Sequence, residues 1–163
     1  MRTSICGNRD KRPRKRSRRA LLRQRVAGPF SVLAVDDDPD VLALVSRILA
    51  SAGYRVLEAV GVADALRMAE QTPPHALITD VALRDGDGYR VVEGVRRFQP
   101  DLAVVITSGF AQDPARLSRF IDQGVGFVQK PFTPAQLLEA LRQALGRAPV
   151  GSDASEVKRR ISM

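Results

Sequence analysis

The sequence predicts an α/β fold, with one doubly wound, five-stranded parallel sheet and helices on both of its faces. After Gly28-Pro29, short apolar runs alternate five times with amphipathic stretches. Several of the runs are continuous Val, Leu and Ile segments, which is typical of strands buried on both faces. Regular alternation of strands and helices implies right-handed crossovers, so the strands are expected to lie parallel in an open sheet.

The five apolar runs are the predicted strands, and the amphipathic stretches are the predicted helices. The strands cover residues 30–35, 54–58, 76–80, 102–107 and 125–129. The helices run from residue 39 to near 53, from 62 to 70, from 89 to 98, from 114 to 124 and from 133 to 145. Asp38 is expected to cap the first helix, which Pro39 opens. The predicted inner faces carry Val41, Leu44, Val45 and Ile48 in the first helix, and Leu137, Leu138, Leu141 and Leu145 in the last.

The positive charge of the chain is concentrated at its N-terminus. The chain has a formal net charge of +8, and residues 1–27 hold eleven Arg or Lys against the single Asp10. That segment carries +10, so the residues from Gly28 onward sum to −2. We expect a basic tail at 1–28, a mildly acidic folded domain at 29–148 and a short C-terminal tail at 149–163.

The basic tail supports three interpretations. It is an arm that binds nucleic acid, a patch that binds an acidic membrane or protein surface, or a segment without function that arises from a misplaced start codon. Its eleven cations favour non-specific, salt-dependent binding. However, the stretch NRDKRPRKRSRRALLRQR has no aromatic residue for stacking on bases. The sequence leaves these interpretations open.

Cysteine usage and hydropathy favour a cytoplasmic protein. Cys6 is the only cysteine and has no partner in the chain, so no disulfide framework is expected. SRRALLR, residues 17–23, resembles a twin-arginine export signal but is not followed by the apolar segment that such a signal needs. No stretch approaches the ~20 apolar residues of a membrane span.

Carboxylates follow two of the predicted strands. Asp36 and Asp37 come directly after the first strand, and Asp80 ends the third. In doubly wound sheets, ligands bind beyond the carboxyl ends of the strands, so we expect the three carboxylates to meet in one crevice. Because adjacent carboxylates repel one another, a cation is expected among them, and hard oxygen ligands favour Mg²⁺.

Groups suited to a phosphoryl ligand end two of the other three strands. Thr107 offers a hydroxyl, and Ser108 and Gly109 after it offer backbone N–H groups. Lys130 follows the last strand and supplies a cation for phosphoryl oxygens. Phosphoryl transfer needs little beyond such positioning and charge neutralisation, and a carboxylate can itself be the nucleophile. The strand ends therefore predict a site that can form an aspartyl-phosphate.

Four segments, in this order and at this spacing, resemble a known family. VDDDPD, LITDVALRDGDGY, VVITSG and FVQKPF are similar to the motifs of the receiver domain of bacterial response regulators. The resemblance covers about residues 30–146 and implies a flavodoxin-like sheet with strand order 2-1-3-4-5. It also implies a role in two-component phosphorelay signalling, with a sensor histidine kinase or a histidine phosphotransfer protein as partner. Such a module is not an enzyme with an external substrate, because it catalyses only its own phosphorylation and dephosphorylation.

The resemblance implies roles for the residues that face the phosphoryl group. Asp80 would accept it, and Lys130 and Thr107 would bind its oxygens. Thr107 and Phe127 stand where the family has its switch pair, and movement of Thr107 toward the phosphoryl group would let Phe127 turn inward. That turn would alter the face of the fourth helix, fifth strand and fifth helix, which is expected to bind a downstream protein or a second copy of the chain.

The resemblance also implies a metal site, with one departure beside it. Asp37, Asp80 and the backbone carbonyl of Ala82 would ligate Mg²⁺, and Asp36 would hold waters of the ion. Arg84 stands where the family usually has Pro, four residues after the acceptor. We expect Arg84 to loosen this loop, to add a cation near the site and to change the lifetime of the phosphoryl group.

Three further residues are given structural roles only. Asp38 is expected to be a helix cap, and Asp87, followed by Gly88, a turn and cap. His75 lies in a loop before the third strand, at the end of the sheet away from the acids. It is therefore predicted to be a surface histidine and not a phosphate donor.

Three alternatives to a stand-alone regulator remain. TSGFAQDPARL with QKPF is similar to receivers at the ends of hybrid sensor kinases, so the chain is alternatively a terminal fragment of one. A protein of another class would bind nucleic acid through the basic arm and use the acidic domain for regulation. A Mg²⁺-dependent phosphatase fits less well, because the sequence has no separate general acid and no substrate-pocket signature.

Overall fold

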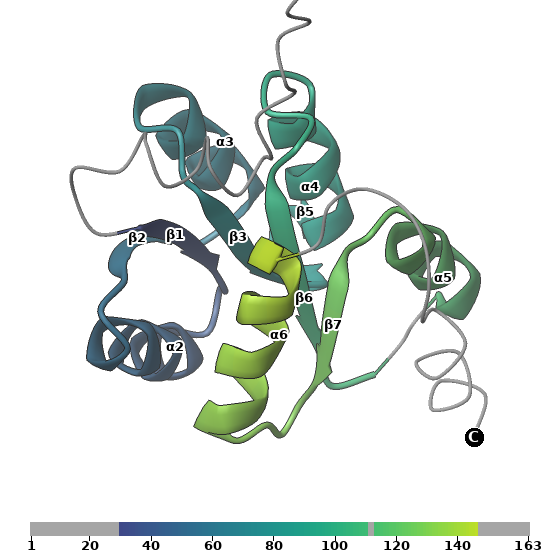
Figure 1. Ribbon diagram of the computed structural model, residues 1–163. Coiled ribbons are helices and arrows are strands. Elements are labelled where there is room, and N and C mark those ends of the chain that lie inside the picture. The colour runs from purple at the N-terminus through teal and green to yellow at the C-terminus, as the bar shows by residue number, and fades with distance from the viewer. Residues whose placement is uncertain (1–29, 111–112, 147–163) are drawn as a thin grey trace, which may run out of the picture.

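The computed structural model describes residues 30–110 and 113–146. The tails predicted at 1–28 and 149–163, Cys6 among them, lie outside these residues, as do the ends of the domain predicted at 29–148. Within the described part, a five-stranded parallel sheet has the order β2-β1-β3-β6-β7, and helices cover both of its faces (Figure 1). This confirms the predicted fold class and strand order, since β6 and β7 are the fourth and fifth strands of the sheet along the chain.

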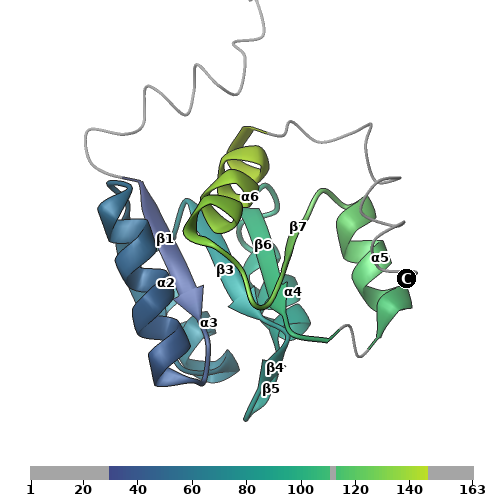
Figure 2. The same cartoon turned by 90° about the horizontal axis from the view of Figure 1, so that it is seen from below.

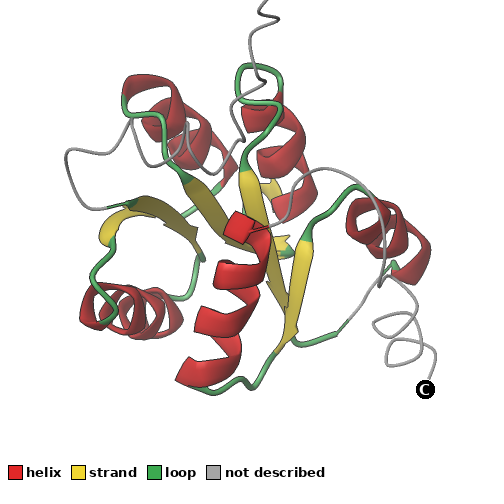
Figure 3. Ribbon diagram, viewed as in Figure 1, coloured by secondary structure: helices red, strands yellow, loops and turns green. Residues whose placement is uncertain are grey.

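The elements agree with their predicted bounds to within about two residues (Figure 3). The sheet strands are β1 (Ser31–Val35), β2 (Arg55–Ala59), β3 (Ala76–Asp80), β6 (Ala103–Ser108) and β7 (Gly126–Gln129). The helices are α2 (Pro39–Ser51), α3 (Val62–Gln71), α4 (Gly88–Arg96), α5 (Pro114–Asp122) and α6 (Pro134–Gly146). No described helix has both the length and the apolar character that crossing a membrane requires.

The sheet separates two apolar layers, and β1 shows why its apolar run is unbroken. Leu33 and Val35 pack into the layer under α3, α4 and α5. Val32 and Ala34 pack into the layer under α2 and α6. All four side chains are buried. A strand of this kind has no solvent face, so its sequence does not alternate between apolar and polar residues.

The buried face of α2 is rotated from the predicted face by about one residue position. Leu44 is 46% exposed, whereas Leu42 and Leu49 are buried together with Val45 and Ile48. The helix has apolar pairs at 41–42, 44–45 and 48–49, so two neighbouring stripes are almost equally apolar. Only the packing against the sheet selects between them. In α6, Leu137 and Leu141 are buried as predicted, Leu138 and Leu145 are half-buried against the same layer, and Ala144 is the third buried residue.

A short hairpin that the sequence did not predict follows β3. It pairs β4 (Ala82–Leu83) with β5 (Gly86–Asp87) in an antiparallel ladder, and it projects at the carboxyl end of the sheet (Figure 2). The carboxylate of Asp85, in its turn, accepts hydrogen bonds from the backbone N–H groups of Val62 and Ala63, at 2.8 and 3.1 Å. These two bonds lower the pKa of Asp85. The hairpin therefore caps the N-terminus of α3.

Candidate functional site

The carboxyl ends of β1 and β3 bring three acids together. Asp36 and Asp37 follow β1, and Asp80 is the last residue of β3. The two strands are parallel neighbours, so their ends lie side by side. One carboxylate oxygen of each acid lies within 4.8 Å of those of the other two. The predicted crevice of three carboxylates is therefore present.

Lys130 holds two of these carboxylates. Its Nζ lies 2.8 Å from Asp36 Oδ2 and 3.0 Å from Asp80 Oδ2. The backbone N–H of Lys130 donates to the carbonyl of Ser108 at 2.8 Å, which fixes the start of the side chain at the end of β6. Because β6 and β3 lie between β7 and β1, the lysine extends across the ends of two strands to reach Asp36.

The charges of the site are only partly balanced. Burial is the main cause that raises the pKa of Asp80, and the charge of Asp36 raises it further, while Lys130 lowers it. Burial lowers the pKa of Lys130, but its hydrogen bonds with Asp36 and Asp80 outweigh burial, so the net direction is upward. Lys130 therefore stays charged at neutral pH. One lysine does not neutralise three carboxylates, so the crevice favours a further cation.

Asp37 faces a second basic side chain. Arg84 Nε lies 3.2 Å from Asp37 Oδ2, and the arginine side chain is 80% exposed. The prediction that Arg84 adds a cation near the site is confirmed. The loop that it was expected to loosen is instead the β4-β5 hairpin, which Asp85 fixes to α3. A pair as exposed as this one is weakened by solvent and salt.

Thr107 lies beside the predicted acceptor. Asp80 and Thr107 are paired in register on β3 and β6. The threonine side chain is buried, and its hydroxyl donates to the carbonyl of Thr79 at a long distance of 3.4 Å. Phe127 lies on the next strand, β7, half-buried against the layer under α3, α4 and α5. The roles of Thr107 and Phe127 as a switch stay predictions, as does the carbonyl of Ala82, which begins β4.

Gly88 is important for the site, and the sequence did not predict this role. A Cβ at Gly88 would lie 2.0 Å from the carbonyl oxygen of Asp80. The N–H of Gly88 donates to the carbonyl of Val81 at 2.9 Å, so α4 begins directly against the acceptor. Asp87 caps α4 as predicted, because its carboxylate accepts from the N–H of Arg90 at 3.0 Å. The signal that could have identified this contact is the glycine immediately after the cap.

Asp38 and His75 were predicted to have structural roles only, and both contact neighbouring residues of the fold. Asp38 caps α2 as predicted and accepts from the N–H of Asp40 at 2.9 Å. His75 precedes β3 at the amino end of the sheet, away from the acids. Its Nδ1 lies 3.0 Å from the N and 2.8 Å from the Oγ of Ser31, and its ring packs on Phe30. His75 is half-buried, so it is a partly exposed side chain that Ser31 and Phe30 hold in place, away from the acids as predicted.

The fold and the site together define a flavodoxin-like α/β protein with an acidic, lysine-containing centre at the carboxyl ends of its strands. The chain belongs to the response regulator receiver domain family, whose sequence profile matches residues 32–142. The resemblance that the motifs carry is therefore confirmed.

Curated relatives include regulators and a kinase. The chain is 34% identical over 116 residues to the transcriptional regulatory protein PrrA of Mycobacterium leprae, covering 71% of this chain and 50% of that protein. It is 30% identical to the sensor kinase CckA of Brucella abortus, over 74% of this chain and 13% of the kinase. The chain therefore spans about half the length, or less, of these curated relatives.

Solved structures agree with this assignment. A putative response regulator from Chloroflexus aurantiacus J-10-fl is 30% identical, with a TM-score of 0.66 over 74% of this chain and all of the other. The receiver domain of the hybrid histidine kinase CckA is also 30% identical, with a TM-score of 0.60 over 71% of this chain and 98% of the other. The predicted class, a receiver domain of two-component signalling, is confirmed.

Proposed function

We propose that this chain takes a phosphoryl group onto Asp80 from the phosphohistidine of a sensor histidine kinase or a histidine phosphotransfer protein. The observation that carries the proposal is the carboxylate of Asp80, held 3.0 Å from Lys130 Nζ beside two further acids. Membership of the receiver family supports the same role. The similarity to sensor kinase CckA supports a second form of the proposal, in which the chain is the terminal receiver of a hybrid kinase.

The proposed transfer uses the two oxygens of Asp80 differently. Oδ1 accepts a hydrogen bond from the N–H of Val81 at 2.7 Å, which leaves Oδ2, the oxygen that faces Lys130, as the nucleophile. As the bond from Oδ2 to phosphorus forms, the phosphorus–nitrogen bond of the donor breaks, and the imidazole nitrogen keeps the electron pair. Lys130 then neutralises the phosphoryl oxygens. The hydroxyl of Thr107 donates to one of them in place of its long bond to Thr79.

The site fits a bound Mg²⁺. Asp37, Asp80 and the carbonyl of Ala82 would hold the ion, and carboxylate oxygens within 4.8 Å of one another are the ligands that it prefers. The ion would supply positive charge to the acceptor and the phosphoryl oxygens. Asp36 is 3% exposed, and both of its oxygens already accept hydrogen bonds. It is therefore better suited to hold a metal-bound water than to bind the ion directly.

The output of the proposed receiver lies on the face formed by α5, β7 and α6. Thr107 and Phe127 would act as the switch, because they lie on the neighbouring strands β6 and β7. That face would bind a downstream protein or a second copy of the chain. The receiver would occupy residues 29–148, act in the cytoplasm and catalyse only its own phosphorylation and dephosphorylation.

Intact mass spectrometry tests the proposal. The full chain is incubated with acetyl phosphate and Mg²⁺, alongside Asp80→Asn and the control Asp40→Asn, which changes an exposed acid in the first turn of α2. Wild type and Asp40→Asn should each gain one phosphoryl group, and Asp80→Asn and samples in EDTA should gain none. Equal labelling of Asp80→Asn, or no labelling of wild type, would exclude Asp80 as the acceptor.

A further inference from the structure

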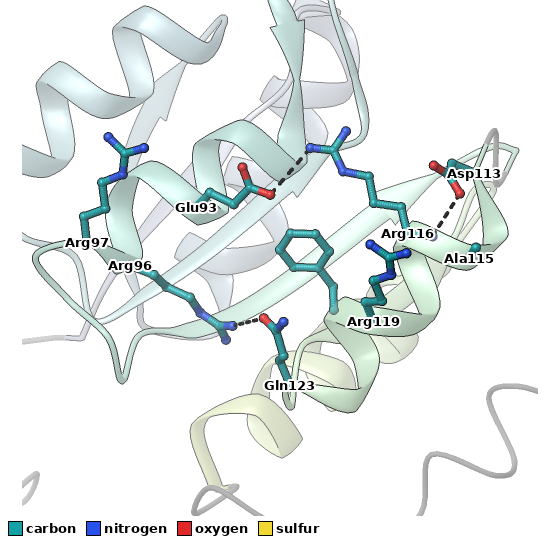
Figure 4. Close-up of a pocket in the computed structure, with 9 residues that line it drawn as sticks. Glu93, Arg96, Arg97, Asp113, Ala115, Arg116, Arg119 and Gln123 are labelled. Atoms are coloured by element: carbon teal, nitrogen blue, oxygen red, sulfur yellow. Dashed lines mark hydrogen bonds and ion pairs between the residues drawn. The ribbon is translucent and has the colours of Figure 1, made fainter.

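A pocket of about 570 Å³ lies between α4 and α5 (Figure 4). The residues that line it include Glu93, Arg96, Arg97, Arg116, Arg119 and Phe120. It has no lining residue in common with the three acids at the carboxyl end of the sheet. Its volume lies within the ~300–1,000 Å³ that is usual for small-molecule sites. The proposed phosphorylation chemistry uses none of its residues.

One of the four arginines in the pocket is neutralised by the protein itself. Arg116 Nη1 lies 3.0 Å from Asp87 Oδ2, and its Nη2 lies 3.6 Å from Glu93 Oε1. The guanidinium also lies over the ring of Tyr89, 4.5 Å from its centroid. Figure 4 shows Arg116 directed toward Glu93 from the other helix. The carboxylate of Glu93 is therefore already paired. Asp113, the second acid that lines the pocket, accepts a hydrogen bond from the backbone N–H of Arg116 at 2.9 Å, so two carboxylates face four arginines.

Two other arginines of the pocket have no counterion in the part of the chain that the structure describes. Arg97, at the end of α4, and Arg119, in α5, are both exposed. In the described part of the chain, neither side chain makes an ion pair or a hydrogen bond. They lie on the two opposite walls of the pocket. Figure 4 shows Arg97 directed away from Arg119, so Arg97 would have to turn inward for an anion in the pocket to have a guanidinium on each side.

Arg96 is the strongest indication that an anion is missing. Its Nε is buried and has no hydrogen-bond partner among the described residues. Its Nη1 donates only to Gln123 Oε1, a neutral acceptor, at 3.4 Å (Figure 4). Burial lowers the pKa of Arg96, and no carboxylate offsets that effect. A half-buried cation with one weak neutral partner is costly to the fold, and a bound anion would compensate it.

We propose that this pocket binds a small organic anion that carries two or more phosphate charges. Arg96, Arg97 and Arg119 bind the phosphate oxygens, since guanidinium groups match phosphate geometry with paired N–H donors. Phe120 supplies an apolar wall for the organic part of the ligand. The pocket is thus a second ligand site, on the side of the sheet that α4 and α5 cover.

Calorimetric titration of the full chain in EDTA tests the proposal, with pyrophosphate and ATP as probes. Wild type should bind both saturably, and tighter binding of ATP would show that the organic part contributes. Arg97→Gln/Arg119→Gln should weaken binding by about tenfold or more, the effect of losing charge-assisted hydrogen bonds. Arg47→Gln/Arg55→Gln removes the same charge at exposed positions on α2 and β2 and should leave the affinity within about twofold.

Arg96→Gln provides a second readout, in thermal unfolding. Without ligand, this variant should melt at a higher temperature than wild type, because it removes an uncompensated buried charge. A lower melting temperature together with unchanged probe binding would show that Arg96 is a structural residue and would overturn its assignment. Labelling of Asp80 by acetyl phosphate should persist in all of these variants, so a failure of this proposal is distinguishable from a failure of the phosphorylation proposal.

Three results would overturn the proposal as a whole. The first result is that neither probe binds saturably. The second is that the two double variants lose the same amount of affinity. The third is that a poly-glutamate peptide binds while pyrophosphate does not. The second result would indicate attraction to net charge alone. The third would indicate an acidic protein partner.

Discussion

Replacement of Arg84 by Ala should increase the affinity of the acidic site for Mg²⁺. Arg84 Nε lies 3.2 Å from Asp37 Oδ2, an oxygen that the proposed ion would need. The ion and the guanidinium therefore compete for the same carboxylate. Arg84→Ala removes the competitor and leaves Asp36, Asp37 and Asp80 unchanged.

The exposure of Arg84 sets the size of the effect. Its side chain is 80% exposed, and exposed ion pairs are worth about 0.2–1 kcal/mol in mutational cycles. That range converts to a gain of roughly 1.4-fold to fivefold in Mg²⁺ affinity. The gain should shrink in about 0.5 M salt, because the Debye length there is only a few ångström. A gain much larger than fivefold would require a contact that this geometry does not contain.

Calorimetric titration with Mg²⁺ measures the affinity directly and does not depend on phosphorylation. Arg142→Ala is the matched control, since it removes an arginine of similar exposure from an ion pair with Glu139 on α6. If both variants gain equally, the effect arises from net charge and the competition argument is wrong. An affinity that falls in Arg84→Ala would mean that Arg84 supports the metal site. The expected change in phosphoryl lifetime is tested separately, and an Arg84→Pro variant with an unaltered dephosphorylation rate would count against it.

Three further predictions follow from the same site. Lys130→Met should lower the free energy of unfolding by about 3 kcal/mol, because it leaves Asp36 and Asp80 without their cation. Urea unfolding measures this loss, and added Mg²⁺ should restore part of it. The pKa of Asp80 is raised in the folded state, so its contribution to stability is present at low pH and is lost as the pH rises through the folded pKa. In EDTA, the melting temperature of wild type minus that of Asp80→Asn should therefore fall as the pH rises from 4 toward neutrality; a difference that rises would contradict the direction of the shift. Gly88→Ala should destabilise the protein by about 1–3 kcal/mol, because the added methyl group clashes with the Asp80 carbonyl, and it should also reduce labelling by acetyl phosphate. The control Gly109→Ala should unfold like wild type, because a Cβ at Gly109 meets nothing within 4 Å.

The sequence predicts best those features of the fold in which a local pattern of apolar residues determines which strand ends come together. The five sheet strands are recognisable because they are buried on both faces and therefore apolar throughout. Once the strands are parallel, residues that end different strands must meet at one edge. This is why Asp36, Asp80, Thr107 and Lys130 could be placed together from the sequence.

The parts that the sequence did not predict depend on packing between elements. The β4-β5 hairpin has two residues in each strand, too few for a periodic pattern. The contact of Arg84 with Asp37 depends on that hairpin, and the cap that Asp85 provides for α3 joins segments 22 or more residues apart. The pocket between α4 and α5 requires the orientation of two helices, because Arg96 and Arg119 come from different elements.

The side chain of Lys130 has a mechanical consequence as well as an electrostatic one. It links the edge strand β7 to the end of β1 across two intervening strands. If Lys130 turned from Asp36 toward a phosphoryl group on Asp80, it would give up its anchor at the end of β1 and keep the one that it already has at the end of β3. Phosphorylation at the middle of the sheet would thereby change how the edge strand β7, which carries Phe127 and borders the proposed output face, is linked to β1. The same ammonium group would then both stabilise the phosphoryl group and transmit its presence.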